Sequence, residues 1–154
     1  MEGLSLKKKL NGKQVEKLAE DFENKTPPET LKWALDQFHP RIALASSFSL
    51  EDGVITDMLS KINPKFRVFT LDTGRLNQET YSLIDRIRAR YDVPIEVYYP
   101  DTASVEKMVR EHGMNLFYES VDSRRLCCNV RKVEPLMRAL SSLDAWITGL
   151  RREQ

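Results

Sequence analysis

The chain has 154 residues, 41% of them hydrophobic and 31% charged, and its net charge is +1. These values are typical of one soluble globular domain and exclude a disordered chain. The near-neutral charge gives no reason to expect nucleic acid or a membrane surface as a partner. No apolar run approaches the roughly 18–20 residues that cross a bilayer. Two cysteines and a basic start without an apolar segment behind it predict a cytoplasmic protein.

The first 25 residues are expected to form an N-terminal arm and a helix, separate from a domain over 26–154. That first helix covers about 14–22, where apolar side chains recur at helical spacing. Thr26-Pro27-Pro28-Glu29 predicts the start of a second helix, because Thr suits the N-cap, Pro the first position and Glu the third. We expect this second helix to end before Pro40.

Strands and helices then alternate along the chain. Apolar runs predict four strands, at 42–45, 66–71, 95–99 and 145–148. The helices expected between them cover 50–59, 78–91, 104–112 and a last segment that Pro135 should interrupt. On that last helix one face carries Leu126, Val130, Val133, Met137 and Leu140. This alternation predicts an α/β fold with a mostly parallel sheet and helices on both faces, which binds ligands at the carboxyl ends of its strands.

The loop after the first strand, Ser46-Ser47-Phe48-Ser49, carries three hydroxyl groups directly before a helix. Backbone N–H groups at a helix start favour an anion, and the hydroxyls add donors for phosphate or sulfate. An ordinary serine N-cap explains the same residues equally well. The loop has neither a GxxxxGK[ST] nor a GxGxxG pattern, which argues against Walker-type and dinucleotide sites.

Two further loops follow strands at the same edge of the expected sheet. In Leu71-Asp72-Thr73-Gly74, Asp and Thr can bond a sugar or base, and glycine lets the backbone approach closely. A simple turn before a helix capped by Asn77 explains this loop better when it is taken alone. The last predicted strand ends at Gly149 with Arg151 behind it, and arginine suits sulfate or phosphate, although a solvated terminus also explains it.

The only cysteines, Cys127 and Cys128, are adjacent. They are poor disulfide partners, because a trans peptide fixes their Cα atoms at about 3.8 Å and an unstrained bridge usually needs about 4.4–6.8 Å. Nearby basic side chains favour thiolates, which suit a soft metal or an iron–sulfur cluster. The alternative is that both are buried small side chains on a helix with a basic face. The basic residues concerned are Arg124, Arg125, Arg131 and Lys132.

Taken together, these segments resemble the assimilatory adenylyl-sulfate (APS) reductase family, relatives of the PAPS reductases in the PP-loop group. The resemblance covers nearly the whole chain from about Thr26. It implies a three-layer Rossmann-like PP-loop fold of the adenine nucleotide alpha hydrolase type. The matching motifs, in chain order, are SSFSLED at 46–52, LDTGRL at 71–76 with ETY at 79–81, CCNVRKVEPL at 127–136 and WITGLR at 146–151.

The resemblance also implies a function and a site. Family members reduce APS to sulfite and AMP in sulfate assimilation and cysteine biosynthesis, with thioredoxin or glutaredoxin as reductant. In this sequence, serines of the first loop would surround the phosphosulfate, the second loop would face adenosine, and Lys132 would lie between the sulfate and the cluster. The implied substrate-binding residues are Ser46, Ser47, Phe48, Ser49, Leu71, Asp72, Thr73, Lys132, Gly149 and Arg151.

In the family the vicinal cysteines supply two ligands of a [4Fe–4S] cluster, and PAPS reductases without a cluster lack the pair. Family members continue past the position of Gln154 with a CxxC pair and a tail that carries the catalytic cysteine. We therefore expect a C-terminally truncated member that binds APS without turnover, holds little or no complete cluster through Cys127 and Cys128, and can form a homo-oligomer.

Two kinds of alternative are open. The chain can belong to a PAPS reductase or to a PP-loop enzyme that adenylates a substrate with ATP. Adenylating PP-loop enzymes usually have a glycine-rich SGGxDS loop, whose bare backbone can approach a triphosphate. Ser46-Ser47-Phe48-Ser49 replaces those glycines, which argues against ATP. A non-catalytic binding module is also conceivable, but it would leave Cys127-Cys128 without a purpose.

Overall fold

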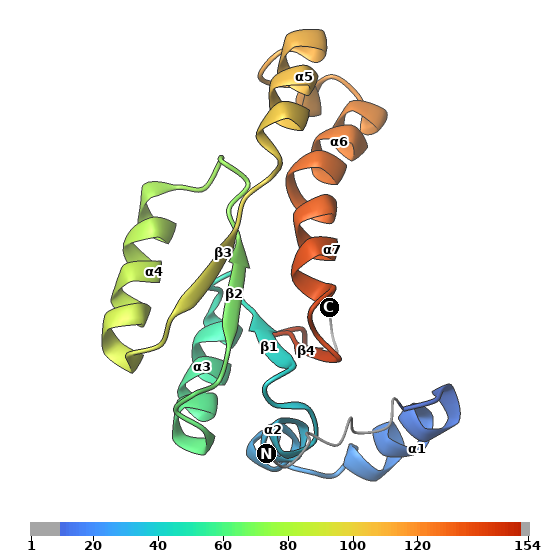
Figure 1. The fold of residues 1–154 in the computed structure, drawn as a ribbon, viewed down its shortest axis with the longest axis vertical. Coiled ribbons are helices and arrows are strands. Elements are labelled where there is room, and N and C mark those ends of the chain that lie inside the picture. Colours follow the sequence, from blue (N-terminus) through green and yellow to red (C-terminus); the bar gives the residue numbers. More distant parts are fainter. Residues whose placement is uncertain (1–9, 152–154) are drawn as a thin grey trace, which may run out of the picture.

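A sheet of four parallel strands forms the centre of the chain, in the order β3-β2-β1-β4. The structure is a computed structural model and describes residues 10–151. In Figure 1, α3 and α4 lie on one side of the sheet and α7 on the other. The predicted three-layer α/β fold is therefore confirmed. The strands are β1 Ile42–Ala45, β2 Val68–Leu71, β3 Ile95–Tyr98 and β4 Ala145–Ile147.

Polar side chains mark most of the helix starts, as the sequence predicted. Asn11 and Gln14 form a capping box, so the first helix begins two residues earlier than expected. Asp101 accepts a hydrogen bond from the Ser104 backbone N–H at 2.8 Å and so caps α5. The helices are α1 Gly12–Phe22, α2 Pro27–Phe38, α3 Leu50–Ile62, α4 Gln78–Tyr91, α5 Thr102–His112, η1 Leu116–Tyr118, α6 Val121–Cys128, η2 Asn129–Val133 and α7 Glu134–Leu140.

The core follows from the alternation of side chains along the strands. Ile42 and Leu44 point to one face of the sheet, where they pack with residues of α2 and α3 such as Leu35 and Leu59. The intervening residue, Ala43, points to the other face of the sheet. There it forms a cluster with Phe69 of β2 and Ala139 of α7. Both faces of β1 and β2 are covered, which explains their continuous apolar runs.

The order of the strands locates the edge where a ligand is expected. The chain moves outward from β1 to β2 and β3, and then returns to place β4 on the free side of β1. The strand order thus reverses between β1 and β4. In parallel sheets the loops at the carboxyl ends diverge at this point and leave a crevice.

The helix that carries the cysteines is interrupted, as Pro135 predicted, but in an unexpected way. A π-helical turn, η2, separates α6 from α7, and the Glu134 N–H bonds to the Asn129 carbonyl five residues back. The predicted apolar face is correct only in part: Val130 is buried and Leu140 packs against the core, but Leu126, Val133 and Met137 are exposed. The extra residue in the wide turn shifts the helical pattern. The buried positions are Cys127, Val130, Arg131, Pro135 and Ala139.

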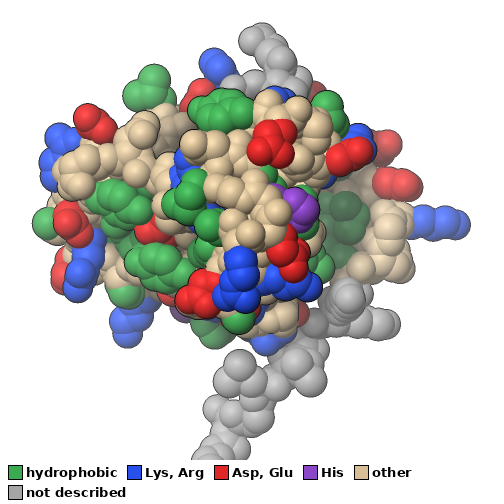
Figure 2. Space-filling model, turned by 90° about the horizontal axis from the view of Figure 1, so that it is seen from above, with side chains coloured by type: hydrophobic (Ala, Val, Ile, Leu, Met, Phe, Trp, Pro, Cys, Tyr) green, Lys and Arg blue, Asp and Glu red, His purple; other side chains and the backbone are tan. Residues whose placement is uncertain are grey.

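The first helix lies at the periphery. None of its residues is buried, and Phe22 contacts the Trp33 ring of α2 with ring centroids 4.8 Å apart. The predicted arm over the first residues lies outside 10–151. Within that range, no helix is both long and apolar enough to cross a membrane. On the face shown in Figure 2, basic and acidic side chains lie interspersed.

Candidate functional site

A cavity of about 580 Å³ opens at the crevice between β1 and β4. This volume lies within the range of roughly 300–1,000 Å³ that small-molecule sites usually occupy. The apolar lining residues include Leu71, Leu76 and Trp146. The charged lining residues are Lys132, Glu51 and Asp52. Hydroxyl groups also line the cavity, from Ser46, Ser47, Ser49, Thr70, Thr73, Thr80 and Thr148.

The structure brings most of the predicted substrate-binding residues to this cavity, although they come from four separate segments. Three predicted residues, Phe48, Asp72 and Arg151, do not line it. Neither do Cys127 and Cys128. Those that do are Ser46, Ser47, Ser49, Leu71, Thr73, Lys132 and Gly149.

Phe48 shapes the serine loop from inside the protein. Its side chain is buried, and its φ of 62° lies in the left-handed region that side chains other than glycine rarely adopt. The Phe48 N–H donates to Ser46 Oγ at 3.0 Å, which holds this turn. The residue expected among the ligand contacts therefore anchors the loop to the core.

Asp72 is a buried turn residue rather than part of the cavity lining. Its Oδ1 accepts hydrogen bonds from the Gly74 N–H at 2.7 Å and from the Tyr81 hydroxyl at 3.1 Å. The bond to the Asp72 carboxylate raises the pKa of Tyr81. Asp72 lines a second cavity of about 390 Å³ beside α4 and β3. The turn that the residues alone favoured explains this position, since aspartate commonly bonds the backbone two residues on.

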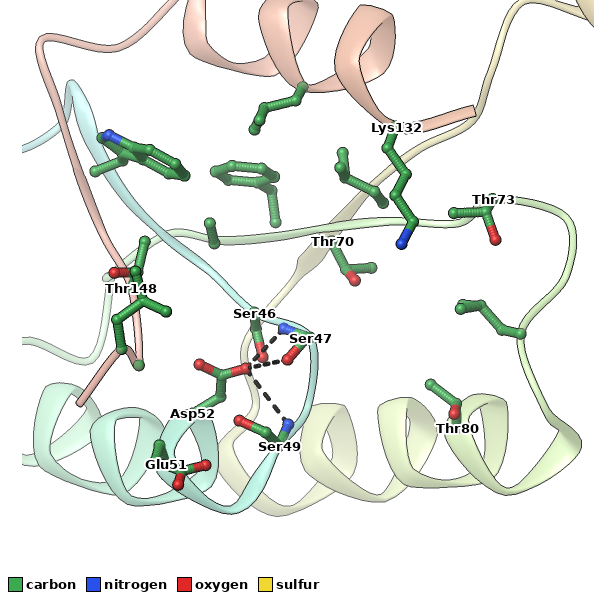
Figure 3. Close-up of a pocket in the computed structure, with 18 residues that line it drawn as sticks. Ser46, Ser47, Ser49, Glu51, Asp52, Thr70, Thr73, Thr80, Lys132 and Thr148 are labelled. Carbon is green, nitrogen blue, oxygen red and sulfur yellow. Dashed lines mark hydrogen bonds between the residues drawn. The ribbon is translucent and has the colours of Figure 1, made fainter. Parts of the chain in front are cut away.

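The serine loop is held by Asp52, a role that the sequence did not reveal. This carboxylate is buried at the first turn of α3, and its Oδ2 accepts from the Ser47 N–H at 2.7 Å, the Ser47 hydroxyl at 2.9 Å and the Ser49 N–H at 3.4 Å. Figure 3 shows the three bonds converging on one oxygen. Ser47 is thus occupied, and the Ser49 hydroxyl caps α3 and bonds to Glu51. The Ser46 hydroxyl, which accepts from the Phe48 N–H, is the serine best placed to donate to a ligand.

The segment after β4 closes the cavity against the start of α3. A β-carbon on Gly149 would lie 2.5 Å from Asp52 Oδ1, so only glycine fits there without a shift. Arg151 Nε forms an ion pair with Glu51 Oε1 at 3.1 Å. The pKa of Glu51 is lowered first by the backbone N–H at the helix start, next by the Ser49 hydroxyl and then by Arg151. The arginine therefore lies at the rim.

Lys132 supplies the positive charge of the cavity. In Figure 3 its side chain extends from the helix into the space between Thr70 and Thr73. It is the one cationic side chain in the lining formed by residues 10–151. Sequence reasoning missed Thr70, Thr80 and Thr148. The strand prediction could have indicated Thr70 and Thr148, because both are polar residues at the carboxyl ends of β2 and β4, where ligands bind in parallel sheets.

The two cysteines occupy different environments. Cys127 is buried in a small apolar cluster with Met108, Leu116 and Val130, whereas Cys128 is partly exposed. No group of three or more metal-binding side chains occurs in the described part of the chain. A [4Fe–4S] cluster takes four cysteine ligands, so the residues described here offer half of such a donor set.

Comparisons with known proteins agree with the motifs. The family model of the phosphoadenosine phosphosulfate reductase domain matches residues 41–154. Adenosine 5'-phosphosulfate reductase of Burkholderia cepacia is 47% identical over 116 residues, which cover 75% of this chain and 46% of that protein. The chloroplastic 5'-adenylylsulfate reductase 3 of Arabidopsis thaliana is 45% identical over 139 residues, 90% of this chain and 30% of that protein.

A solved structure extends the likeness to the fold. The crystal structure of phosphoadenylyl-sulfate (PAPS) reductase from Candida auris, a phosphate complex, matches with a TM-score of 0.80 and 29% identity over 93% of this chain and 70% of that one. The chain spans half or less of the length of the curated relatives named above. On these matches, the chain belongs to the phosphoadenosine phosphosulfate reductase domain family.

Proposed function

We propose that this chain is the substrate-binding part of an APS reductase, which reduces adenylyl sulfate to sulfite and AMP in sulfate assimilation. The observation that carries the proposal is the cavity at the β1–β4 crevice, which is lined by hydroxyl groups, Lys132 and apolar side chains. The names of the bacterial and plant relatives support the same activity.

The lining contains groups that suit both ends of adenylyl sulfate. Ser46 and Lys132 offer a hydroxyl donor and a cation, which suit the phosphosulfate. Leu71 and Leu76 offer apolar contacts to the adenine ring. The charge of Lys132 would be worth most here, because a ligand that fills the cavity excludes water and strengthens the attraction.

The charges in the cavity favour APS over its competitors. PAPS carries a further phosphate and ATP a triphosphate, and each adds negative charge. Within residues 10–151 the lining offers only Lys132 against Glu51 and Asp52, while Arg151 is paired with Glu51. An added phosphate would thus find no second cation in the lining formed by these residues. A PAPS reductase is the second candidate, supported by the Candida auris structure.

We also propose that Cys127 and Cys128 are two ligands of an iron–sulfur cluster in the whole enzyme. Adjacent free thiols suit this role, and Cys128 lies four residues before Lys132 on the same helical segment. Such a cluster would supply a polarisable, redox-active group to the whole enzyme. Thioredoxin or glutaredoxin as reductant and a homo-oligomer belong to the proposal through family resemblance alone. A cytoplasmic location belongs to it through the cysteine content and the sequence of the first residues.

Iron analysis tests the ligand role. Anaerobic reconstitution of this chain should give less than one [4Fe–4S] per chain, since two thiols fill half the ligand set. Replacing both cysteines with serine should remove the iron that remains bound. Equal iron in the two proteins would contradict the assignment.

Calorimetry tests the substrate. Adenylyl sulfate titrated into the chain should bind saturably at one site, and PAPS and ATP should compete poorly. AMP serves as the matched control, because it shares the nucleoside and lacks the sulfate. Tighter binding of PAPS would favour the second candidate, and preferred binding of ATP would contradict both.

A further inference from the structure

A buried arginine lies behind the wall of the cavity. Arg131, on the π turn η2, is only 8% exposed, and its Nε has no hydrogen-bond partner. It takes part in no ion pair among residues 10–151. Burying a guanidinium without a carboxylate partner costs free energy, so we expect a specific hydrogen bond to offset that cost.

That contact is with the loop that follows β2. Arg131 Nη1 donates to the Thr73 carbonyl at 2.7 Å. A β-carbon on Gly74 would lie 3.3 Å from the same nitrogen, and the φ of Gly74 is +70°. The guanidinium therefore lies directly against the turn, and glycine leaves room for it.

Arg75 holds the same loop from the other direction. Its Nη1 donates to the Met114 carbonyl at 2.9 Å and its Nη2 to Asn115 Oδ1 at 3.0 Å. Its guanidinium also lies 4.6 Å from the centre of the Phe117 ring. The loop over 73–76 is thus tied on both sides of Gly74: by Arg75 to the turn before η1, and by Arg131 to η2.

We propose that Arg131 and Arg75 are positioning residues that fix the 73–76 loop in the shape that binds substrate. Thr73 and Leu76 of this loop line the cavity, whereas the two guanidinium groups do not. Lys132 follows Arg131 directly and reaches the cavity from the same turn. The π turn therefore carries one basic residue for the ligand and one for the loop.

The effect on affinity follows from the population of the ordered loop. For a ligand that needs the ordered loop, the apparent dissociation constant equals the intrinsic one divided by the fraction of molecules in which the loop is ordered. If the loss of a charged hydrogen bond lowers the ordered fraction to about one-tenth, binding should weaken about tenfold. The identity of the ligand rests on the proposed function, but the ordering of the loop does not.

The first test compares Arg131→Met with Arg131→Lys by calorimetric titration of adenylyl sulfate. Methionine keeps the bulk and loses the donor, and should weaken binding about tenfold. Lysine keeps a donor for the Thr73 carbonyl and should restore most of the affinity. Arg138→Met is the matched control: Arg138 lies on the same helical segment and donates to the Tyr99 carbonyl, outside the cavity lining. It should leave affinity unchanged, and an Arg131→Met protein that binds like the unsubstituted chain would overturn the proposal.

The second test needs no ligand. The Gly74 N–H, bonded to Asp72 Oδ1 at 2.7 Å, reports opening of the loop by hydrogen exchange. Its exchange should be about tenfold faster in Arg131→Met and in Arg75→Met, with the amides of β1 unaffected, and a double variant should show less than the product of the two effects. Unchanged exchange in the Arg75→Met protein, whose altered side chain is exposed, would overturn the proposal even if Arg131→Met fails to fold. Faster exchange in a chain that never binds adenylyl sulfate would instead contradict the proposed substrate alone.

Discussion

Gly149 and Asp52 are packed so closely that a β-carbon on residue 149 would lie 2.5 Å from Asp52 Oδ1. Asp52 also accepts the bonds that hold the serine loop. One carboxylate therefore joins the segment after β4 to the loop after β1, across the point where the strand order reverses.

Gly149→Ala should damage both stability and ligand binding. The added carbon would displace Asp52 or the segment after β4, which should lower the free energy of unfolding by about 1–3 kcal/mol. Urea unfolding measures the stability, and calorimetry with adenylyl sulfate measures the binding. Gly53→Ala is the control, because Gly53 lies within α3 and its added carbon would meet nothing within 4 Å. That variant should be as stable as the unsubstituted chain or up to about 1 kcal/mol more so.

Asp52→Asn should loosen the serine loop. The oxygen of an amide is a weaker acceptor than a carboxylate oxygen, so it would leave at least one of the three donors weakly bonded. This should lower the free energy of unfolding by about 1–3 kcal/mol. The thermal midpoint should fall, and the affinity for adenylyl sulfate should fall with it. Asp57→Asn on the same helix removes an exposed pair with Lys61 and should cost less than about 1 kcal/mol. Equal losses in the two variants would mean that the Asp52 bonds do not organise the loop.

Lys132→Ala should weaken adenylyl sulfate binding with little change in stability. A charged hydrogen bond is worth about 1.5–3 kcal/mol, which corresponds to roughly 10- to 150-fold in affinity. Stability should hold because the residue is exposed and its side chain extends into the cavity. Lys107→Ala, on the exposed surface of α5, is the control and should bind normally. Unchanged affinity in the Lys132 variant would rule out the proposed contact.

Acid should weaken the sheet through Glu96. The Arg67 guanidinium, which lies 2.8 Å from Glu96 Oε1, holds the pKa of that carboxyl below its usual range. The folded-state pKa is therefore depressed, and the stabilisation is present above the ordinary glutamate pKa and lost as the pH falls through the folded-state value. The difference in free energy of unfolding between the unsubstituted chain and Glu96→Gln should be largest near pH 7 and shrink below about pH 4. Urea unfolding from pH 7 to pH 3 measures it, and a constant difference would contradict the assignment.

Local patterns were sufficient for the elements and for most of the cavity. Capping residues such as Thr26, apolar strand runs and the serine loop could be read without neighbours in space, because helix starts and strand periodicity depend on residues a few positions apart. The carboxyl-end rule then located the site, and the motifs indicated the family. Domain division at residue 25 and the roles assigned to single site residues stay predictions.

What the sequence alone determined was the α/β order, the family and the loops that carry the site. Only the tertiary structure decided which side chain in each loop does what. Asp52 and Asp72 are both buried aspartates in strand-to-helix connections, Asp52 in the first turn of α3 and Asp72 directly after β2. Asp52 organises the cavity, whereas Asp72 closes a turn away from it. Arg131 and Lys132 are adjacent, yet one is buried under a loop and the other enters the cavity. The physical reason is that burial and hydrogen-bond partners come from segments distant in the chain, and the extra residue of the π turn rotates the helix in a way that no periodic pattern encodes.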